Sequence, residues 1–497
     1  MADLAPCGNG SPSTVLVIGC GQRETSQAMF EKMYQRGLRV VVAAHEGAWV
    51  SALVSSGTVE LLVTVPGLWT APQTEELATH VVQKISCSGV ARIDAVFNVY
   101  YHYLLLSARI ASRLGCITNA PDAVETCIVK SKGRACLTSA GLEDWQSYSF
   151  RTMDELKRVA GIVEYPAVLK PTDSSGSYGV VKVFSPRDAT VQFLALKAES
   201  WFQSDETEFI LEEYIDGPEF GVEIVMQDGK VLFSSVMDAS KQKDSIFFQG
   251  TGRSCPSSQP PSIQESTVDH CCAAVKALGL TTGVLDIDVR YSRAHGPRVL
   301  EVNPRMGGGS VDVMHRLAHG IDLVHLGLSI FLGIGVADEV AARESCPAKC
   351  FEAGWLMSPR SGVIQNISLF TERLKAKFRG EACVMSISAL REDGAEVIGT
   401  NAGLPTCLIE VVTSGASKSL ALEHLDMVLS SAEGSIGDLV RAPESTMPAK
   451  AIDATGSHAL PLAAHVSADG EIEEEDSDCE TVATQTDIRG QVTESFV

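Results

Sequence analysis

The sequence predicts a mixed α/β and α+β architecture, with a Rossmann-like domain at residues 14–120 followed by an α+β region. Three observations lead to this prediction. Short apolar strands alternate with amphipathic helices through residues 14–120. Beyond residue 160, alternating apolar and polar residues indicate hairpins instead. From residue 442 the composition becomes rich in Pro, Ser, Thr, Ala and acids, which is typical of a disordered tail.

In the first domain, TVLVIG, LRVVVAAH, ELLVTVP and AVFNVYY read as buried strands with helices between them. This βαβ order implies a parallel, doubly wound sheet. Gly19 and Gly21 follow the first strand, but position 24 is Glu where a dinucleotide fingerprint needs a third Gly. We therefore predict no NAD site in this domain.

Composition limits the function classes. The chain has 497 residues, 45% of them hydrophobic, and a formal net charge of −22, which argues against nucleic-acid and anionic-membrane binding. No apolar run reaches the roughly 18 residues of a membrane span. The 14 cysteines lack metal-finger spacing, so we expect reduced thiols that pack as small apolar side chains. We expect a soluble, cytoplasmic protein.

Three segments in the middle of the chain carry lysines, glycines and carboxylates. Residues 124–142 read as one helix containing Lys130. A strand then ends at Lys170, and the loop 172–179, rich in Ser and Gly, leads into another strand. A P-loop would place its Lys after the glycines and before a helix, so this is a different phosphate-binding arrangement. The third segment is the string EEYIDGPE at residues 212–219.

The hairpin of GVLDIDVR and RVLEVNPR concentrates polar residues on one face. Alternate strand residues share a face, which groups Glu301, Asn303 and Arg305 on one strand and Asp286 with Asp288 on the other. Carboxylate and carbonyl oxygens are the ligands that Mg²⁺ prefers, and a planar Arg suits a phosphate or an oxyanion. The residues therefore predict a metal and phosphate site, as opposed to a solvated strand face.

The motif E-V-N-P-R-M-G-G, preceded by an acid thirteen residues before its Glu, resembles the metal-binding end of the ATP-grasp ligases, most closely carnosine synthase and the L-amino-acid ligases. The resemblance covers roughly residues 14–440. It implies a preATP-grasp domain (14–120) that often holds one substrate, an ATP-grasp domain (121–340, with a flap lobe at about 150–210) and a small α+β lobe (341–441). Outside it we expect a flexible N-terminus (1–13) and, from composition, a disordered acidic tail (442–497).

The same resemblance assigns roles to residues. It implies two Mg²⁺ or Mn²⁺ ions held by Asp288, Glu301 and Asn303, with Asp286 the less favoured ligand, and Arg305 as the catalytic residue. It implies an ATP site made by Lys130, Lys170, Ser174, Ser175, Gly176, Ser177, Gly179, Glu212, Glu213, Ile215 and Glu219. Lys130, Arg134, Leu137 and Gly141 match the family's helix pattern, although Val129 stands where an Asp is usual.

The implied activity is amide-bond formation between two amino acids. ATP would phosphorylate one carboxylate and release ADP (or AMP), and an amine would then displace phosphate. The loop after residue 240 would face the substrates, with Lys241, Gln249 and Arg253 as candidate contacts. Relatives carry a Glu where this chain has Gln249, so their preference for an amino group does not transfer directly.

Two alternatives stay open. One is another ATP-grasp reaction, such as that of a carboxylase or a nucleotide-pathway ligase, although the chain has no biotinyl-lysine motif. The other is a nucleotide-binding scaffold, which would predict a broken metal site. The tail contains Thr484-Gln485-Thr486, which resembles a strand motif that docks onto dynein light chain. Homo-oligomerisation is compatible with the sequence, but no motif in the sequence predicts it.

Overall fold

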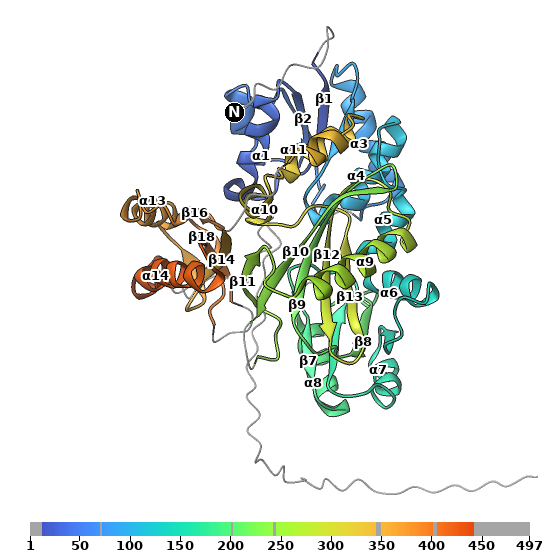
Figure 1. Cartoon of the computed structure of the whole chain (residues 1–497). Helices are drawn as coiled ribbons and strands as arrows, with labels where there is room; N and C mark the ends of the chain where they lie inside the picture. Colours follow the sequence, from blue (N-terminus) through green and yellow to red (C-terminus); the bar gives the residue numbers. More distant parts are fainter. Residues whose placement is uncertain are drawn as a thin grey trace, which may run out of the picture. The chain divides into compact units, whose positions relative to one another are not determined.

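The computed structural model describes residues 12–69, 72–199, 202–241, 245–343, 349–400 and 405–441 (Figure 1). The predicted acidic tail and its Thr484–Thr486 motif lie outside these ranges, as does most of the predicted flexible N-terminus. Among the described residues, none of the helices combines the length and apolar character that a bilayer span requires. The described cysteines are all free, and several of them, including Cys20 and Cys271, are buried.

The N-terminal domain contains the predicted parallel sheet, with strand order β3-β2-β1-β4. Its elements are β1 (Thr14–Ile18), α1 (Arg23–Gln35), β2 (Arg39–Ala44), α2 (Ser51–Ser55), β3 (Leu61–Thr64), α3 (Glu75–Cys87), β4 (Ala95–Phe97) and α4 (Leu104–Leu114). Every residue of β1 is buried: Val15 and Val17 pack with α1 on one face, and Leu16 and Ile18 belong to the core on the other. Burial on both faces is why this strand is continuously apolar.

Two helices and a four-stranded antiparallel sheet follow. The elements are α5 (Pro121–Ile128), α6 (Lys130–Ser139), β5 (Ser147–Phe150), α7 (Met153–Ala160), β6 (Ala167–Pro171), β7 (Val181–Val183), α8 (Pro186–Ala198) and β8 (Phe209–Glu213). The strand order is β5-β8-β6-β7. The prediction of one continuous helix over residues 124–142 is wrong: Val129 has an extended backbone (φ −90, ψ 102) that separates α5 from α6. Lys130 is consequently the first residue of a new helix.

The largest sheet has eight strands in the order β13-β12-β9-β10-β11-β14-β18-β16. Its strands are β9 (Glu219–Gln227), β10 (Lys230–Lys241), β11 (Gly250–Cys255), β12 (Gly283–Ser292), β13 (Gly296–Asn303), β14 (Cys350–Met357), β16 (Val384–Ala389) and β18 (Cys407–Gly415). Helix α9 (Pro261–Ala277) contacts β10, β12 and β13, and α14 (Lys418–Ile436) contacts β14 and β18.

The C-terminal strands therefore extend the sheet that carries the predicted metal site. Strand β11 pairs with β14 through Ser254 and Glu352, which joins residues on either side of the predicted boundary at 340. The remaining elements of this region are α12 (Ala337–Ala341), β15 (Gly362–Ile364), α13 (Ile367–Lys377), β17 (Glu396–Val397) and β19 (Val440–Arg441), and the order β17-β15-β19 forms a small separate sheet.

The chain returns to the N-terminal domain after β13. Helices α10 (Val311–His319) and α11 (Leu323–Phe331) follow the Gly-rich turn, and Val324 and Leu328 of α11 are buried in the core that β1, β2 and α1 share. Gly327 permits this contact, because a Cβ at this position would lie 3.0 Å from the Phe97 ring.

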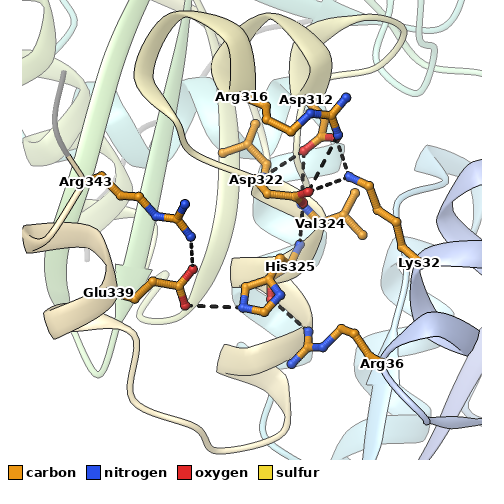
Figure 2. Close-up of polar contacts among 10 residues, drawn as sticks. Lys32, Arg36, Asp312, Arg316, Asp322, Val324, His325, Glu339 and Arg343 are labelled. Carbon is orange, nitrogen blue, oxygen red and sulfur yellow. Dashed lines mark hydrogen bonds and ion pairs between the residues drawn. The ribbon is translucent and has the colours of Figure 1, made fainter. Parts of the chain in front are cut away.

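Charged residues join α1 to these two helices (Figure 2). The Lys32 ammonium lies 2.7 Å from Asp312 and 2.8 Å from Asp322. Arg36 donates to the main-chain oxygen of His325, whose ring lies 3.2 Å from Glu339. These contacts fix the segment that follows the predicted metal site against the N-terminal domain.

Candidate functional site

Strands β12 and β13 form the predicted hairpin, and the register of the pair brings its polar residues together. Asp286 lies opposite Asn303, and Asp288 lies opposite Glu301. Strand β9 continues these rows, with Glu223 opposite Asp286 and Gly221 opposite Asp288. Directly opposed residues project from the same face of a sheet, so the polar side chains collect on one face. The alternate residues Leu285, Ile287 and Val289 pack with α9 on the other face.

Lys130 reaches this face from the start of α6. Its side chain is buried, and its Nζ lies 3.6 Å from the Glu301 carboxylate and donates to the main-chain oxygen of Ser174. The main-chain N–H of Lys130 donates to Thr172 O at 3.0 Å. One residue therefore contacts both the candidate metal ligand and the loop that follows β6.

Lys170 belongs to a buried cluster with Glu212 and Arg134. The Glu212 carboxylate forms an ion pair with Lys170 and lies 3.6 Å from Arg134 Nε. Burial lowers the pKa of Lys170, and Glu212 partly offsets this effect. Arg134 also donates to Val299 O at 2.8 Å and stacks 3.7 Å from the Trp145 ring. The carboxylate of Glu212 thus neutralises two buried cations, a role beyond the nucleotide contact that the resemblance implies.

The Ser/Gly loop after β6 contains residues with positive φ, as its glycine content suggests. Gly176 and Ser177 both have positive φ, at 64° and 62°, and Gly179 has φ 74°. A Cβ on Gly179 would also lie 2.9 Å from the Pro171 ring. Gly176 and Ser177 are the central residues of a tight turn that is closed by the Tyr178 N–H, which donates to Ser175 O at 3.2 Å.

The segment after β8 is fixed by Arg290, which sequence reasoning did not select. Arg290 donates to Ile215 O at 2.8 Å, and its Nε and Nη2 both lie 3.2 Å from the Glu219 carboxylate. The guanidinium also lies 5.0 Å from the centre of the Tyr214 ring. Arg290 is two residues beyond Asp288 on the same strand face, so the alternation that identified Asp288 could have identified it.

Arg305 follows the hairpin and contacts Asp286. Its Nη1 lies 3.4 Å from Asp286 Oδ2 and donates to Met306 O at 2.5 Å. Asp286 also accepts from Asn303 Nδ2 at 3.5 Å, which leaves the Asn303 amide oxygen as the atom that suits a cation. Asp286 therefore orients the Arg and the Asn, whereas Asp288 and Glu301 lie side by side in the next row.

These residues surround one cavity of about 340 Å³. The predicted site residues that line it are Lys130, Lys170, Ser174, Ser175, Gly176, Ser177, Glu212, Glu213, Ile215, Glu219, Gln249, Arg253, Asp288, Glu301, Asn303 and Arg305. Gly179 is not among the lining residues, and the side chain of Lys241 lies outside the described part of the structure. The lining also includes Trp145, Phe248, Trp355 and Cys407, which the sequence did not identify.

The donor set fits a cation that also binds phosphate. Among the described residues, no three His, Cys, Asp or Glu side chains are grouped to hold a metal ion by themselves. Asp288, Glu301 and the Asn303 amide offer only oxygen donors, the type that Mg²⁺ and Mn²⁺ use with substrate phosphates. Lys130 and Lys170 border the same cavity and would neutralise part of the phosphate charge.

A second cavity, of about 980 Å³, shares Ser174 and Ser175 with the first. It is bordered by the N-terminal domain through Cys20, Trp69 and the segment 100–103, and by Arg391 from the C-terminal region. Burial raises the pKa of Tyr101 well above its usual value, and its hydroxyl donates to Ile128 O at 3.0 Å. The N-terminal domain therefore borders a cavity that adjoins the loop after β6.

Comparison with known proteins assigns the fold. Residues 163–313 match the ATP-grasp domain family. The chain is 27% identical over 343 residues to the ATP-grasp enzyme fsqD of Aspergillus fumigatus, covering 62% of this chain and 57% of that protein. It is 27% identical over 275 residues to carnosine synthase 1 of Gallus gallus, covering 52% of this chain and 29% of that protein. Both alignments thus span less than two thirds of the relative's length.

Among solved structures, an L-amino acid ligase from Bacillus licheniformis has the same fold. The two share a TM-score of 0.67 and 21% sequence identity, and the match covers 86% of this chain and 98% of the ligase. The predicted fold class is therefore confirmed. Residues 163–313 thus match an ATP-grasp domain, and the chain shares the fold of an ATP-grasp ligase over most of its length.

Proposed function

We propose that this protein is an ATP-dependent carboxylate–amine ligase that forms an amide bond between two amino acids through an acyl phosphate. The observation that supports the proposal most strongly is the convergence of Lys130, Lys170, the Ser174–Ser177 loop and the hairpin residues on one cavity. This set can bind a triphosphate and stabilise negative charge in the same place. Relatives named as carnosine synthase and L-amino acid ligase support the same reaction class.

The first step transfers the γ-phosphoryl group. A carboxylate oxygen of the acid substrate forms a bond to the γ-phosphorus while the bond to the β,γ-bridging oxygen breaks, giving an acyl phosphate and ADP. Lys130 and Lys170 bind phosphate oxygens from two sides, and Arg305 stabilises the charge on the transferring group. Asp288, Glu301 and Asn303 would hold Mg²⁺ or Mn²⁺, which when bound neutralises phosphate charge.

The second step forms the amide. The amine nitrogen attacks the carbonyl carbon, and the carbon–oxygen bond to phosphate breaks with its electron pair leaving on phosphate. The substrate ammonium loses two protons overall, one retained by the released hydrogen phosphate and one passed to solvent. Arg305 suits the oxyanion of the tetrahedral intermediate because it is a planar, permanently charged donor.

The test is ADP release by the purified protein with Mg-ATP or Mn-ATP and a panel of amino acids, singly and in pairs. We expect ADP and phosphate in equal amounts with one particular pair, together with a new amide detected by mass spectrometry. ATP binding without ADP release from any pair would contradict the dipeptide reaction. Bicarbonate-dependent ADP release would instead indicate a carboxylase.

A further inference from the structure

A small cavity of about 60 Å³ lies beside the candidate metal residues on the same face of the eight-stranded sheet. Residues without bulky side chains border it, among them Gly221, Ala239 and Gly252. A Cβ built on Gly221, which lies opposite Asp288, meets no atom within 4 Å. The missing side chain therefore leaves space directly next to Asp288, a candidate metal ligand.

Glu223 is the most deeply buried of the five acidic residues that border this cavity, the others being Glu219, Asp238, Asp286 and Asp288. It is 1% exposed, and its Oε1 accepts the main-chain N–H of Gly307 at 2.8 Å. Its Oε2 is also shielded from solvent, yet it has no hydrogen-bond partner within the described part of the chain. A buried carboxylate oxygen without a partner is costly. Burial, followed by the nearby Asp286, raises the pKa of Glu223, so this position favours an added cation or proton donor.

Arg253 supplies the opposite charge. It lines both this cavity and the nucleotide cavity, and its Nη1 donates to Gly308 O at 3.1 Å. Its guanidinium lies 5.9 Å from the centre of the Trp355 ring, which also borders both cavities. One wall thus offers a carboxylate and another a guanidinium, across a cavity that shares Asp286, Asp288 and Arg253 with the 340 Å³ cavity.

We propose that this cavity binds the amine-bearing substrate, a small zwitterionic amino acid, with Glu223 receiving its ammonium group and Arg253 its carboxylate. The inference rests on the proposed ligase function and names the subsite and class of its second substrate. Gln249 lines the neighbouring cavity and is neutral, so it cannot form an ion pair with an ammonium group. We therefore assign recognition of the substrate amino group to Glu223, which lies on β9. The small volume limits the side chain of that substrate to a short one.

The competing explanation is that Glu223 only positions the Gly-rich turn through Gly307. Glu223→Gln separates the two, because the amide keeps an oxygen that can accept the Gly307 N–H but replaces the second carboxylate oxygen with an NH2 group, which cannot accept from an ammonium. Arg253→Ala and Arg253→Lys test whether the guanidinium on the opposite side of the cavity binds the substrate carboxylate. Glu352→Gln is the matched control: Glu352 is 2% exposed and also has a buried oxygen without a partner. Its register with Ser254, Asp238 and Phe220 places it on the opposite face of the sheet.

The experiment separates the two half-reactions with hydroxylamine, a small nucleophile that traps an acyl phosphate as a hydroxamate without an amino-acid acceptor. The acid substrate and Mg-ATP are held saturating, and glycine, L-alanine, β-alanine or ethylamine is varied as the acceptor. We expect Glu223→Gln to raise the KM of the amino-acid acceptor about 30-fold or more. Hydroxamate formation should fall far less. Ethylamine has no carboxylate, so Arg253→Ala should remove the preference for amino acids over it, and Arg253→Lys should restore part of it.

Each result decides between the explanations. Equal losses of hydroxamate and amide in Glu223→Gln would indicate a role in positioning and overturn the inference, as would an unchanged acceptor KM in both variants. Glu352→Gln should resemble the parent protein in both assays. If the parent protein forms no hydroxamate with any acid, the proposed ligase function fails, and the subsite fails with it.

Discussion

Replacing Glu301 by Gln is expected to lower pair-dependent ADP formation by about three orders of magnitude. Glu301 is a candidate metal ligand and its carboxylate lies 3.6 Å from Lys130 Nζ. The substitution removes an anionic oxygen from a site where charge stabilisation is worth several kcal/mol, and each ~1.4 kcal/mol changes the rate tenfold. The measurement is the initial rate of ADP release over a range of Mg²⁺ and Mn²⁺ concentrations.

The metal dependence distinguishes this effect from simple misfolding. The apparent affinity for Mn²⁺ should fall in Glu301→Gln, whereas Glu352→Gln, a buried carboxylate on the other face of the same sheet, should leave it unchanged. A Glu301→Gln protein that binds Mn-ATP normally and keeps more than a tenth of the rate would contradict the assignment of Glu301 as a metal ligand.

Arg305→Ala is the substitution with the second-largest expected effect. It should lower kcat about 10²–10³-fold and change the KM for ATP little. The Arg305 guanidinium is held by Asp286 at 3.4 Å and by Met306 O at 2.5 Å, beside Asn303. This position suits charge that develops on the transferring phosphoryl group and the oxyanion, so the loss should appear in the chemical steps. Single-turnover kinetics with radiolabelled ATP would measure it.

Two further variants sharpen this test. Arg305→Lys should recover only part of the rate, because an ammonium cannot form the two parallel hydrogen bonds of a guanidinium. Arg293→Ala removes an exposed arginine from the turn of the same hairpin and should have no effect. A loss confined to the KM for ATP in Arg305→Ala would instead assign Arg305 to nucleotide binding.

Local periodicity predicted much of the site. The alternation in GVLDIDVR and RVLEVNPR determines which residues share a face, whereas the register of Asp288 with Glu301 also depends on a bulge at Asp288/Val289 that alternation does not predict. The parallel N-terminal sheet was predictable because its strands are apolar on both faces and separated by helices. These are properties of short stretches of sequence.

Features that depend on distant segments could not be predicted. Trp355 and Cys407 reach the cavity because β14 and β18 extend the sheet beyond β11, and strand alternation does not reveal which strands pair. Glu223 could not be identified from its own strand, because its position beside Asp286 depends on the pairing of β9 with β12. The return of α11 to the N-terminal core likewise depends on packing, and the break at Val129 overrides the helical pattern around it.

The central claim, that a substrate carboxylate is phosphorylated by ATP, is tested most directly by oxygen transfer. The acid substrate is labelled with ¹⁸O in both carboxylate oxygens, and the phosphate and nucleotide products are analysed by mass spectrometry. An acyl phosphate predicts one ¹⁸O in each released phosphate and none in ADP. Unlabelled phosphate would contradict the mechanism, and ¹⁸O in AMP would show that an acyl adenylate forms instead.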